Sequence, residues 1–253
     1  MMGVLSIKNL KKTYSGKLPI EVLHGIDLEV EEGELIAMMG PSGSGKSTFL
    51  NVISTIDEPT SGSVKINGQD PHGMDDEELA SFRRNTLGFV FQSFNLLPTL
   101  TIGENIMLPM TLQKIAVEEM RYRTFETAKL LGIEHLLDKR TYEISGGQAQ
   151  RTAVARAVVE NPAILLADEP TGNLDSKAAK DVMELFVMLN KIKKTTVLMV
   201  THDAQVASYC KKVYIIKDGQ IYQEIAREGD SAVFHEEILD AMTLLGGGRN
   251  DIN

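Results

Sequence analysis

The chain of 253 residues is poor in cysteine, in long apolar runs and in basic charge. Its single cysteine, Cys210, excludes an intrachain disulfide and favours a reducing compartment, and we expect it to be a buried structural thiol. No run approaches the roughly 18 apolar residues that a membrane-spanning helix needs. If the chain serves transport, the pore must therefore lie on another polypeptide.

The N-terminal segment and the charge balance exclude further classes. Residues 1–8 contain neither a basic region nor a long apolar one, so no targeting segment is expected. The chain has 26 Lys and Arg against 35 Asp and Glu, whereas proteins that bind nucleic acid broadly present a basic face. Nucleic acid is therefore not an expected partner, although a local basic patch is allowed. Repeats and low-complexity segments are absent, and 43% hydrophobic residues can fill the core of one domain with an added lobe.

Residues 40–47, GPSGSGKS, form the clearest ligand-binding motif. We expect a short apolar strand at 35–39 and a helix from Lys46 to Thr55, and this context of strand, glycine loop and helix binds the phosphates of a nucleoside triphosphate. Backbone N–H groups approach the phosphate oxygens, Lys46 neutralises them, and the Ser47 hydroxyl binds Mg²⁺. The residues expected to contact the nucleotide here are Gly40, Ser42, Gly43, Ser44, Gly45, Lys46, Ser47 and Thr48.

Polar residues follow three apolar strands farther along the chain. Asp168 and Glu169 come after the run 164–167, and ligands gather at the carboxyl ends of strands in open α/β sheets. We expect Asp168 to hold Mg²⁺ through water and Glu169 to direct the attacking water; the alternative is a pair of solvated acids. His202 and Gln92 follow two other strands. On pattern alone Gln92 is an ordinary strand-end residue, and a lone histidine is more often structural than catalytic.

The hydrophobic pattern predicts an α/β fold on a mainly parallel sheet. Alternating segments at 4–7 and 21–30 indicate an antiparallel β region at the N-terminus. The pattern turns helical from 93 to 159, which predicts a helical subdomain inserted into the sheet domain. Further strands are expected at 62–68, 88–92, 163–167, 196–200, 213–216 and 220–225. The domain would span residues 1–228.

A separate extension is expected at 229–253. Apolar residues recur there near helical spacing, which predicts a helix with one apolar face. The members of that face are Val233, Phe234, Ile238, Met242 and Leu245. The glycines at 246–248 should end this helix, and the last residues are expected to be disordered.

One further motif identifies a family. Ser145-Gly146-Gly147-Gln148 lies about a hundred residues after the phosphate loop and just before the run that ends in Asp168 and Glu169. With these motifs in this order, residues 3–228 resemble the ATP-binding-cassette (ABC) ATPases. The resemblance implies a P-loop NTPase core of the ABC nucleotide-binding type that hydrolyses ATP with Mg²⁺. It also implies that residues 145–148 bind the γ-phosphate of the ATP held by the opposite subunit, so that a homodimer closes on ATP.

The resemblance assigns roles to residues that pattern alone leaves open. His202 would contact the γ-phosphate, and Gln92 would reach Mg²⁺ and water and lie near the membrane partner. Residues 173–175 would cross the dimer interface, with Asp175 near the nucleotide. Tyr14 would stack on adenine; the alternative is a partly buried strand aromatic. Ile144 stands where the family most often has leucine, and its similar volume predicts little effect.

Residues 88–101 and 167–175 look like the branch of the family that includes lipoprotein-release, macrolide-efflux and cell-division ATPases. Segments 207–210, 234–239 and 244–247 look like the bacitracin-resistance (Bce-type) ATPases of Gram-positive bacteria. That resemblance implies a cytoplasmic protein held at the inner face of the membrane by a large permease on a separate chain. It also implies a response to peptide antibiotics that bind cell-wall lipid intermediates. The apolar face of the extension would then dock the permease, or else pack on its own core.

Two other classes remain open. A lipoprotein-release or division ATPase would share every catalytic residue but should lack the apolar tail. A DNA-repair or translation ATPase of the same superfamily would need a coiled-coil or zinc insertion, or two cassettes in one chain, and a basic surface. The sequence contains none of these features.

Overall fold

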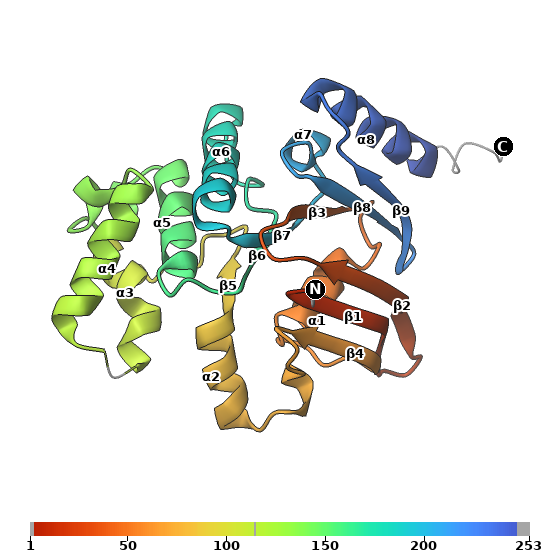
Figure 1. The fold of residues 1–253 in the computed structure, drawn as a ribbon, viewed down its shortest axis with the longest axis horizontal. Helices are drawn as coiled ribbons and strands as arrows, with labels where there is room; N and C mark the ends of the chain where they lie inside the picture. The colour runs from red at the N-terminus through yellow and green to blue at the C-terminus, as the bar shows by residue number, and fades with distance from the viewer. Residues whose placement is uncertain (1–2, 114, 247–253) are drawn as a thin grey trace.

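The computed structural model describes residues 3–113 and 115–246. Its first sheet consists of three antiparallel strands, β2 (Ile20–Val30), β1 (Leu5–Tyr14) and β4 (Ser61–Ile66), with β1 in the middle (Figure 1). Buried and more exposed residues alternate along much of β2 and β4, so one face of the sheet packs against the core. The antiparallel N-terminal region predicted from the sequence is therefore confirmed.

Strand β1 is longer than the segment 4–7 that alternation predicts. Its register against β2 shifts between Ile7 and Leu10. Within this shift Asn9 adopts a positive φ of 47° and donates its backbone N–H to Asp27 Oδ1 at 2.9 Å. A bulge of this kind interrupts the period of two, so the second half of the strand, up to Tyr14, does not stand out in the sequence.

The second sheet has the strand order β5-β6-β7-β3-β8-β9 (Figure 1). All neighbouring strands are parallel except β8 and β9, which are antiparallel. Every residue of β3 and β7 is buried, as expected for a sheet covered on both faces. The strands are β3 (Leu35–Met39), β5 (Leu87–Val90), β6 (Ile164–Asp168), β7 (Thr196–Thr201), β8 (Lys212–Lys217) and β9 (Gln220–Ala226). The carboxyl ends of β3, β6 and β7 therefore meet at one edge.

Helices cover both faces of this sheet. They are α1 (Lys46–Ile53), α2 (Asp76–Thr86), α3 (Ile102–Met107), α4 (Val117–Leu130), α5 (Gly146–Val158), α6 (Ser176–Lys193), α7 (Ala204–Ala207) and α8 (Ser231–Gly246). Short 3₁₀ turns are η1 (Pro71–Gly73), η2 (Leu108–Leu112), η3 (Glu134–Leu136) and η4 (Thr141–Glu143). Within the described ranges no helix is long and apolar enough to cross a membrane.

The buried side chains form two groups on opposite faces of the six-stranded sheet. One group joins this sheet to α1 and to the three-stranded sheet, and includes Phe49 of α1 and Met38 of β3. The other joins the opposite face to α6 and to the helical lobe, and includes Phe186 of α6 and Ala37 of β3. Because α1 is packed between the two sheets, the phosphate loop at its N-terminus has a fixed position.

The helical lobe consists of α3, α4 and α5, which lie together to the left of the sheets in Figure 1. The sequence predicts helical structure from residue 93, but the first lobe helix begins at Ile102. Phe94 and Asn95 both have positive φ angles, of 61° and 49°, which a right-handed helix does not allow. The segment 93–101 is therefore an irregular connection.

Helix α2 is not anticipated by the sequence reasoning above, although its start signal is present. The Asp75 carboxylate accepts hydrogen bonds from the backbone of Glu77 and Glu78, and the Glu78 side chain accepts one from the Asp75 backbone. This capping box identifies a helix N-terminus. The helix lacks a recognisable apolar face in the sequence, because most of its residues are polar and only Phe82 is buried.

The apolar face of α8 packs on the chain's own core. Phe234 and Ile238 are 1% and 0% exposed, and they belong to the group of buried residues that includes α7 and β8. Met242 and Leu245 pack against that group, whereas Val233 is 56% exposed and lies outside it. Of the two alternatives for this face, docking to a permease and packing on the chain's own core, the structure shows the second. The predicted helix end at Gly247 and Gly248 and the predicted disorder beyond it lie outside the described residues.

Candidate nucleotide-binding and catalytic site

The phosphate loop connects the buried strand β3 to α1, and two of its glycines are sterically required. Gly45 has a φ of 102°, and a Cβ there would lie 2.9 Å from Leu23 Cδ2. A Cβ on Gly40 would lie 2.2 Å from the carbonyl oxygen of Ile216. These close approaches let the backbone follow a path that no other residue allows. In contrast, a Cβ on Gly43 would meet nothing within 4 Å, so the centre of the loop faces open space.

The polar groups of this loop fit an anion. Lys46 Nζ donates to the carbonyl oxygens of Gly40 and Pro41 at 2.8 and 2.9 Å, which keeps the ammonium inside the loop. The buried hydroxyl of Ser44 has no hydrogen-bond partner in the described structure. Burial lowers the pKa of Lys46, while the charges of Glu169 and Asp168 raise it. A phosphate oxygen would satisfy the hydroxyl and attract the ammonium, and the N-terminus of α1 favours the same negative charge.

The acid pair lies at the carboxyl end of β6. Burial and the neighbouring charge of Glu169 raise the pKa of Asp168, and Lys46 lowers it. Glu169 has a positive φ of 43°, and its backbone N–H donates to the Val200 carbonyl at 2.9 Å. Its side chain Oε1 lies 2.9 Å from Nδ1 of His202, which follows the adjacent strand β7. The parallel pairing of β6 and β7 thus brings two predicted site residues into contact across 33 positions of sequence.

Gln92 lies against the loop that follows the acid pair. A Cβ on Gly172 would lie 2.6 Å from Gln92 Nε2, and the Asn173 side chain donates to the Gln92 carbonyl at 3.0 Å. The strand β5 ends at Val90, so Gln92 belongs to the connection after the strand rather than to its last position. Gln92 is therefore placed between the catalytic edge of the sheet and the irregular segment 93–101.

The donors at this edge suit Mg²⁺. Ser47 supplies a hydroxyl, Asp168 a carboxylate and Gln92 an amide oxygen, and Mg²⁺ binds hard oxygen ligands. Among the residues that the structure describes, no group of three or more His, Cys, Asp or Glu side chains could hold a metal by itself. A magnesium ion here would therefore also need phosphate oxygens, as is usual when the ion accompanies a nucleotide.

The segment 145–148 begins α5 and faces outward. Ser145 and Gly146 are exposed. The Ser145 hydroxyl accepts a hydrogen bond from the Gln148 backbone at 3.4 Å, and the Gln148 side chain accepts one from the Ser145 backbone at 2.9 Å. This capping box holds Ser145 at the positive end of the helix. Gln148 is thereby occupied in orienting the segment.

A hollow of about 300 Å³ lies beside this helix end. Its lining comes from α5, α6 and the segment around Gly132, with no residue of the phosphate loop. Asp175, predicted near the nucleotide, caps α6 by accepting hydrogen bonds from the backbone of Lys177 and Ala178 at 3.0 Å. The structure thus brings Ser145, Gly147, Gln148 and Asp175 together, but it does not place them in one pocket with the loop of the same chain.

Tyr14 ends β1 close to the phosphate loop. It pairs with Ile20 of β2, and two residues farther along β2 the Val22 carbonyl lies 3.1 Å from the Cβ position of Gly45. The Tyr14 side chain is 39% exposed. This exposed fraction fits the stacking role and also the alternative of a partly buried strand aromatic, so it does not decide between them.

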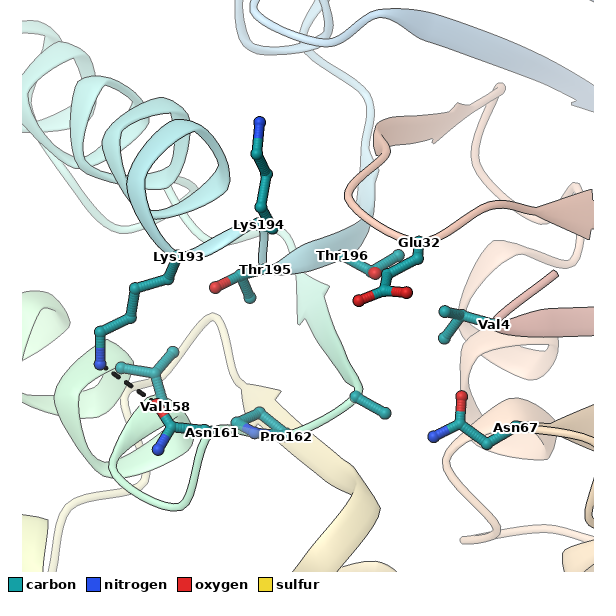
Figure 2. A pocket seen from close by; sticks show the side chains of 11 residues that line it. Val4, Glu32, Asn67, Val158, Asn161, Pro162, Lys193, Lys194, Thr195 and Thr196 are labelled. Atoms are coloured by element: carbon teal, nitrogen blue, oxygen red, sulfur yellow. Dashed lines mark hydrogen bonds between the residues drawn. The ribbon is translucent and has the colours of Figure 1, made fainter. Parts of the chain in front are cut away.

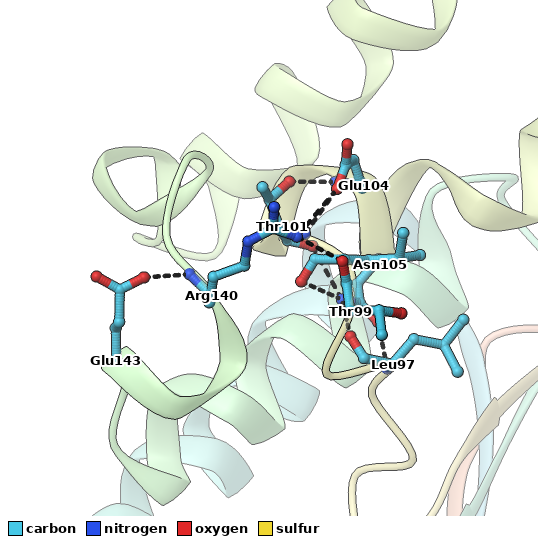
Figure 3. Close-up of polar contacts among 8 residues, drawn as sticks. Leu97, Thr99, Thr101, Glu104, Asn105, Arg140 and Glu143 are labelled. Atoms are coloured by element: carbon cyan, nitrogen blue, oxygen red, sulfur yellow. Dashed lines mark hydrogen bonds and ion pairs between the residues drawn. The ribbon is translucent and has the colours of Figure 1, made fainter.

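Polar contacts that the sequence reasoning missed connect the segment 93–101 to the lobe. The Arg156 side chain on α5 donates to the carbonyls of Phe94 and Asn95 at 2.9 and 2.6 Å. Figure 3 shows a second set of contacts, in which Asn105 bonds to both backbone groups of Leu97 and to the Thr101 carbonyl. Asn105 is 0% exposed. A polar residue between the buried Ile102 and Ile106 was the signal that could have identified it.

Arg140 also contacts the segment 93–101, from the residues that precede α5. Its guanidinium donates to the Thr99 carbonyl, and its backbone N–H donates to Glu143 just before Ser145 (Figure 3). The guanidinium also lies 3.8 Å from Glu104 Oε2. The segment after Gln92 is therefore bonded both to α5 and to the residues that lead into it.

The hollow drawn in Figure 2 lies at the opposite edge of the six-stranded sheet. It has a volume of about 340 Å³, and Asn161, Ala163 and Thr196 place it at the amino ends of β6 and β7. Lys193 Nζ donates to Asn161 Oδ1 at 3.2 Å within it. Ligands of open α/β sheets bind at the carboxyl ends of the strands, so we assign this hollow no part in the nucleotide chemistry.

The comparisons with known proteins agree with this geometry. A family model described as "ABC transporter" matches residues 23–172. ABC transporter ATP-binding protein YxdL of Bacillus subtilis is 56% identical and covers 100% of this chain and 98% of that protein. Bacitracin export ATP-binding protein BceA of Halalkalibacterium halodurans is 47% identical and covers 99% of this chain and 100% of that protein.

A solved structure gives the same result for the fold. The dimeric ATP-binding cassette MJ0796, bound to ADP and Pi after hydrolysis, is similar with a TM-score of 0.81 and 42% identity. The similarity covers 89% of this chain and 100% of that chain. Because the family model spans more than half of the sequence and the relatives align along nearly all of it, this chain belongs to the ABC transporter family and is one of its ATPases.

Proposed function

We propose that this chain is the ATP-hydrolysing subunit of a bacterial ABC transporter that protects cells against a cell-wall-directed peptide antibiotic. The observation that carries the proposal is the extent of the similarity to the bacitracin export protein. It covers 99% of this chain and therefore reaches into the C-terminal extension that contains α8, whereas 89% of this chain already spans the whole MJ0796 cassette. A shared extension favours this branch of the family over branches that lack it.

The nucleotide site divides its roles between two copies of the chain. Lys46, Ser44 and the loop backbone hold the phosphates of ATP, and Mg²⁺ neutralises part of their charge when it is bound. Glu169 accepts the proton of the attacking water, and His202 holds the carboxylate in place through the contact at 2.9 Å. Ser145 and Gly147 offer a helix end to the nucleotide of the second copy, in a homodimer.

When ATP closes the homodimer, the movement would be transmitted to a permease on a separate chain through the groove beside β5. The groove has a volume of about 370 Å³ and contains apolar and basic side chains from β5, α2 and α5. Phe89 and Phe91 form an aromatic pair there with ring centroids 4.2 Å apart. Arg156, which holds the backbone of Phe94 and Asn95, lines the same groove. A permease element seated here would hold the chain at the inner face of the membrane.

Deletion of the gene tests the proposed role. The expected result is greater sensitivity to bacitracin-like peptides or lantibiotics, restored by the wild-type gene and not by Glu169→Gln. Glu184→Gln, on the exposed surface of α6, is the matched control and should restore resistance. Unchanged sensitivity across such a panel, with altered lipoprotein sorting or cell division instead, would assign the chain to the alternative branch.

A further inference from the structure

Tyr14 is held by two charged residues that no motif includes. Its hydroxyl donates to Asp57 Oδ2 at 2.7 Å. The other oxygen of the same carboxylate, Oδ1, accepts a hydrogen bond from Lys12 Nζ at 2.5 Å. Lys12 also donates to the Glu58 carbonyl at 2.7 Å. Both oxygens of Asp57 are therefore engaged, one by the tyrosine and one by the lysine.

The lysine also covers one surface of the aromatic ring. Lys12 Nζ lies 4.8 Å from the ring centroid of Tyr14, which is the geometry of a cation–π contact. Lys12 is only 9% exposed, whereas Tyr14 is 39% exposed. The ring is thus backed by a buried ammonium, and its remaining surface is open to solvent.

The carboxylate that holds the ring is itself fixed. Burial raises the pKa of Asp57, but the hydrogen bonds from Lys12 and from the Tyr14 hydroxyl outweigh it and hold the pKa below its ordinary value. Asp57 is therefore ionised at neutral pH. Its backbone N–H donates to the Asn51 carbonyl at 3.1 Å, which folds the segment 54–58 back onto α1.

A third element supports this segment from behind. Arg83 of α2 donates through Nε to Thr55 Oγ1 at 2.6 Å and through its second nitrogen to the Thr55 carbonyl. Thr55 has a positive φ of 63°, so a specific backbone conformation is being stabilised. The helix that begins with the phosphate loop therefore ends in a rigid turn that holds Tyr14.

We propose that Asp57, together with Lys12, is a positioning residue that fixes the Tyr14 ring in advance as a platform for the adenine base of ATP. The proposal rests on the proposed function only in that the chain binds ATP, and it takes from the family resemblance that Tyr14 receives the base. A ring that is already fixed loses no side-chain freedom when the base stacks on it, and such preorganisation improves affinity. Asp57 holds the ring through the Tyr14 hydroxyl. Lys12 covers one surface of the ring, so a base can stack only on the other surface.

The test compares ligands with and without a base. Titrations measure the Kd of ATP and of inorganic tripolyphosphate for the full-length wild-type protein and for Asp57→Ala, Tyr14→Phe and the double variant. Asp57→Ala should weaken ATP binding about two- to tenfold, because the ring regains its freedom. Tripolyphosphate binding should not weaken, because the loop that holds phosphate is untouched. Removal of a negative charge alone would tighten the binding of both anions, which is the opposite sign.

Two further measurements separate positioning from damage to the fold. In steady-state hydrolysis, Asp57→Ala should raise KM for ATP and change kcat less. The double variant should bind ATP no more weakly than either single variant, because both remove the same contact. Glu21→Ala removes an equally negative, exposed side chain from the neighbouring strand and should not weaken the binding of either anion.

The outcomes are distinct. Equal losses for ATP and tripolyphosphate, or a lowered melting temperature with a parallel loss of both, would overturn the positioning role. An unchanged ATP affinity in both single variants would overturn it as well. Neither result touches the proposed cellular role, which would instead fail if the gene deletion left antibiotic sensitivity unchanged while purified wild-type protein bound ATP normally.

Discussion

The phosphate loop and the Ser145 segment differ in how completely one chain builds them. The loop is set into the core, where Gly45 has no room for a side chain and Lys46 is only 8% exposed. The Ser145 segment is an exposed helix end whose capping groups are satisfied by its own residues. The first is ready for a ligand from within one chain, whereas the second presents a positive helix end in a hollow that contains no residue of the phosphate loop of the same chain.

The difference separates two steps of the ATPase cycle. Binding of ATP should depend on one chain alone, because the lysine, the unpaired hydroxyl and the glycines of its phosphate loop are all in place in the single chain. Hydrolysis should depend on both parts, because the helix end shares no pocket with the loop of its own chain and is proposed to meet the phosphate held by a second copy. Variants of each part should therefore fail at different steps.

Glu169→Gln should have the largest effect. It tests whether ATP hydrolysis can be abolished while ATP binding by the phosphate loop is retained. The amide keeps the shape of the side chain and can still bond to His202, but it cannot accept the proton of water. Turnover should fall about 10²–10⁴-fold while ATP binding is retained. ATPase assays and nucleotide titrations measure the two steps; Glu184→Gln is the control. Turnover at the wild-type rate would remove Glu169 from its assigned role.

Mixing two inactive variants should sharpen the comparison directly. Lys46→Ala damages the loop part and Ser145→Arg the helix-end part, so each homodimer should be inactive. In a mixed dimer both lesions fall on one site and the other site is intact. An equal mixture should therefore recover about a quarter of the wild-type rate if subunits exchange freely and the sites work independently. A strictly monomeric preparation with full activity would contradict the division between two chains.

Arg156→Ala should lower turnover severalfold, a smaller loss that affects only the function of the Ser145 segment. The guanidinium joins α5 to the backbone of Phe94 and Asn95, and hydrogen bonds from charged groups contribute roughly 1.5–3 kcal/mol each. Turnover should fall while ATP affinity stays unchanged, and Arg156→Lys should not restore it, because lysine lacks the planar pair of donors. Arg121→Ala, exposed on α4, serves as the control. A parallel loss of ATP affinity would show that the two parts are not separate.

Asp168→Asn should have the smallest effect, a rise in melting temperature on the order of a few degrees without nucleotide. The pKa of Asp168 is raised in the fold by burial and by Glu169, so its ionised form costs stability at neutral pH. This cost disappears as the pH falls through the raised pKa, and the difference between variant and wild type should shrink with it. Thermal melts across pH measure this, with the exposed Asp240→Asn as control. A variant less stable than wild type at neutral pH would contradict the sign.

Much of the loop part could be predicted from the sequence, because its elements are contiguous. The strand 35–39, the glycine loop and the helix from Lys46 lie within one short stretch, and the structure has them within two residues of the predicted ends. The capping box at Ser145 is equally local. The roles assigned to these residues toward ATP and Mg²⁺ remain predictions, and the experiments above address them.

Other features could not be read from a local pattern. The contact of Glu169 with His202 depends on β6 pairing with β7. The bond between Arg156 and the backbone of Phe94 crosses 62 positions, and that between Tyr14 and Asp57 crosses 43. The apolar face of α8 was visible, but whether it meets a permease or the core was decided only by packing. Phe234 and Ile238 settle it, since both are buried in the core.

The sequence by itself determined the chemistry available to this protein and most of its local elements. Phosphate binding by a backbone loop, helix capping and buried strands each depend on residues that are near neighbours in the chain, and their spacing is fixed by the geometry of the backbone. The tertiary structure decided which distant side chains meet: the histidine with the acid, the arginines with the segment after Gln92, and the carboxylate with Tyr14. Those contacts follow from strand order and core packing, which are set by the whole chain at once and have no period that a local segment could reveal.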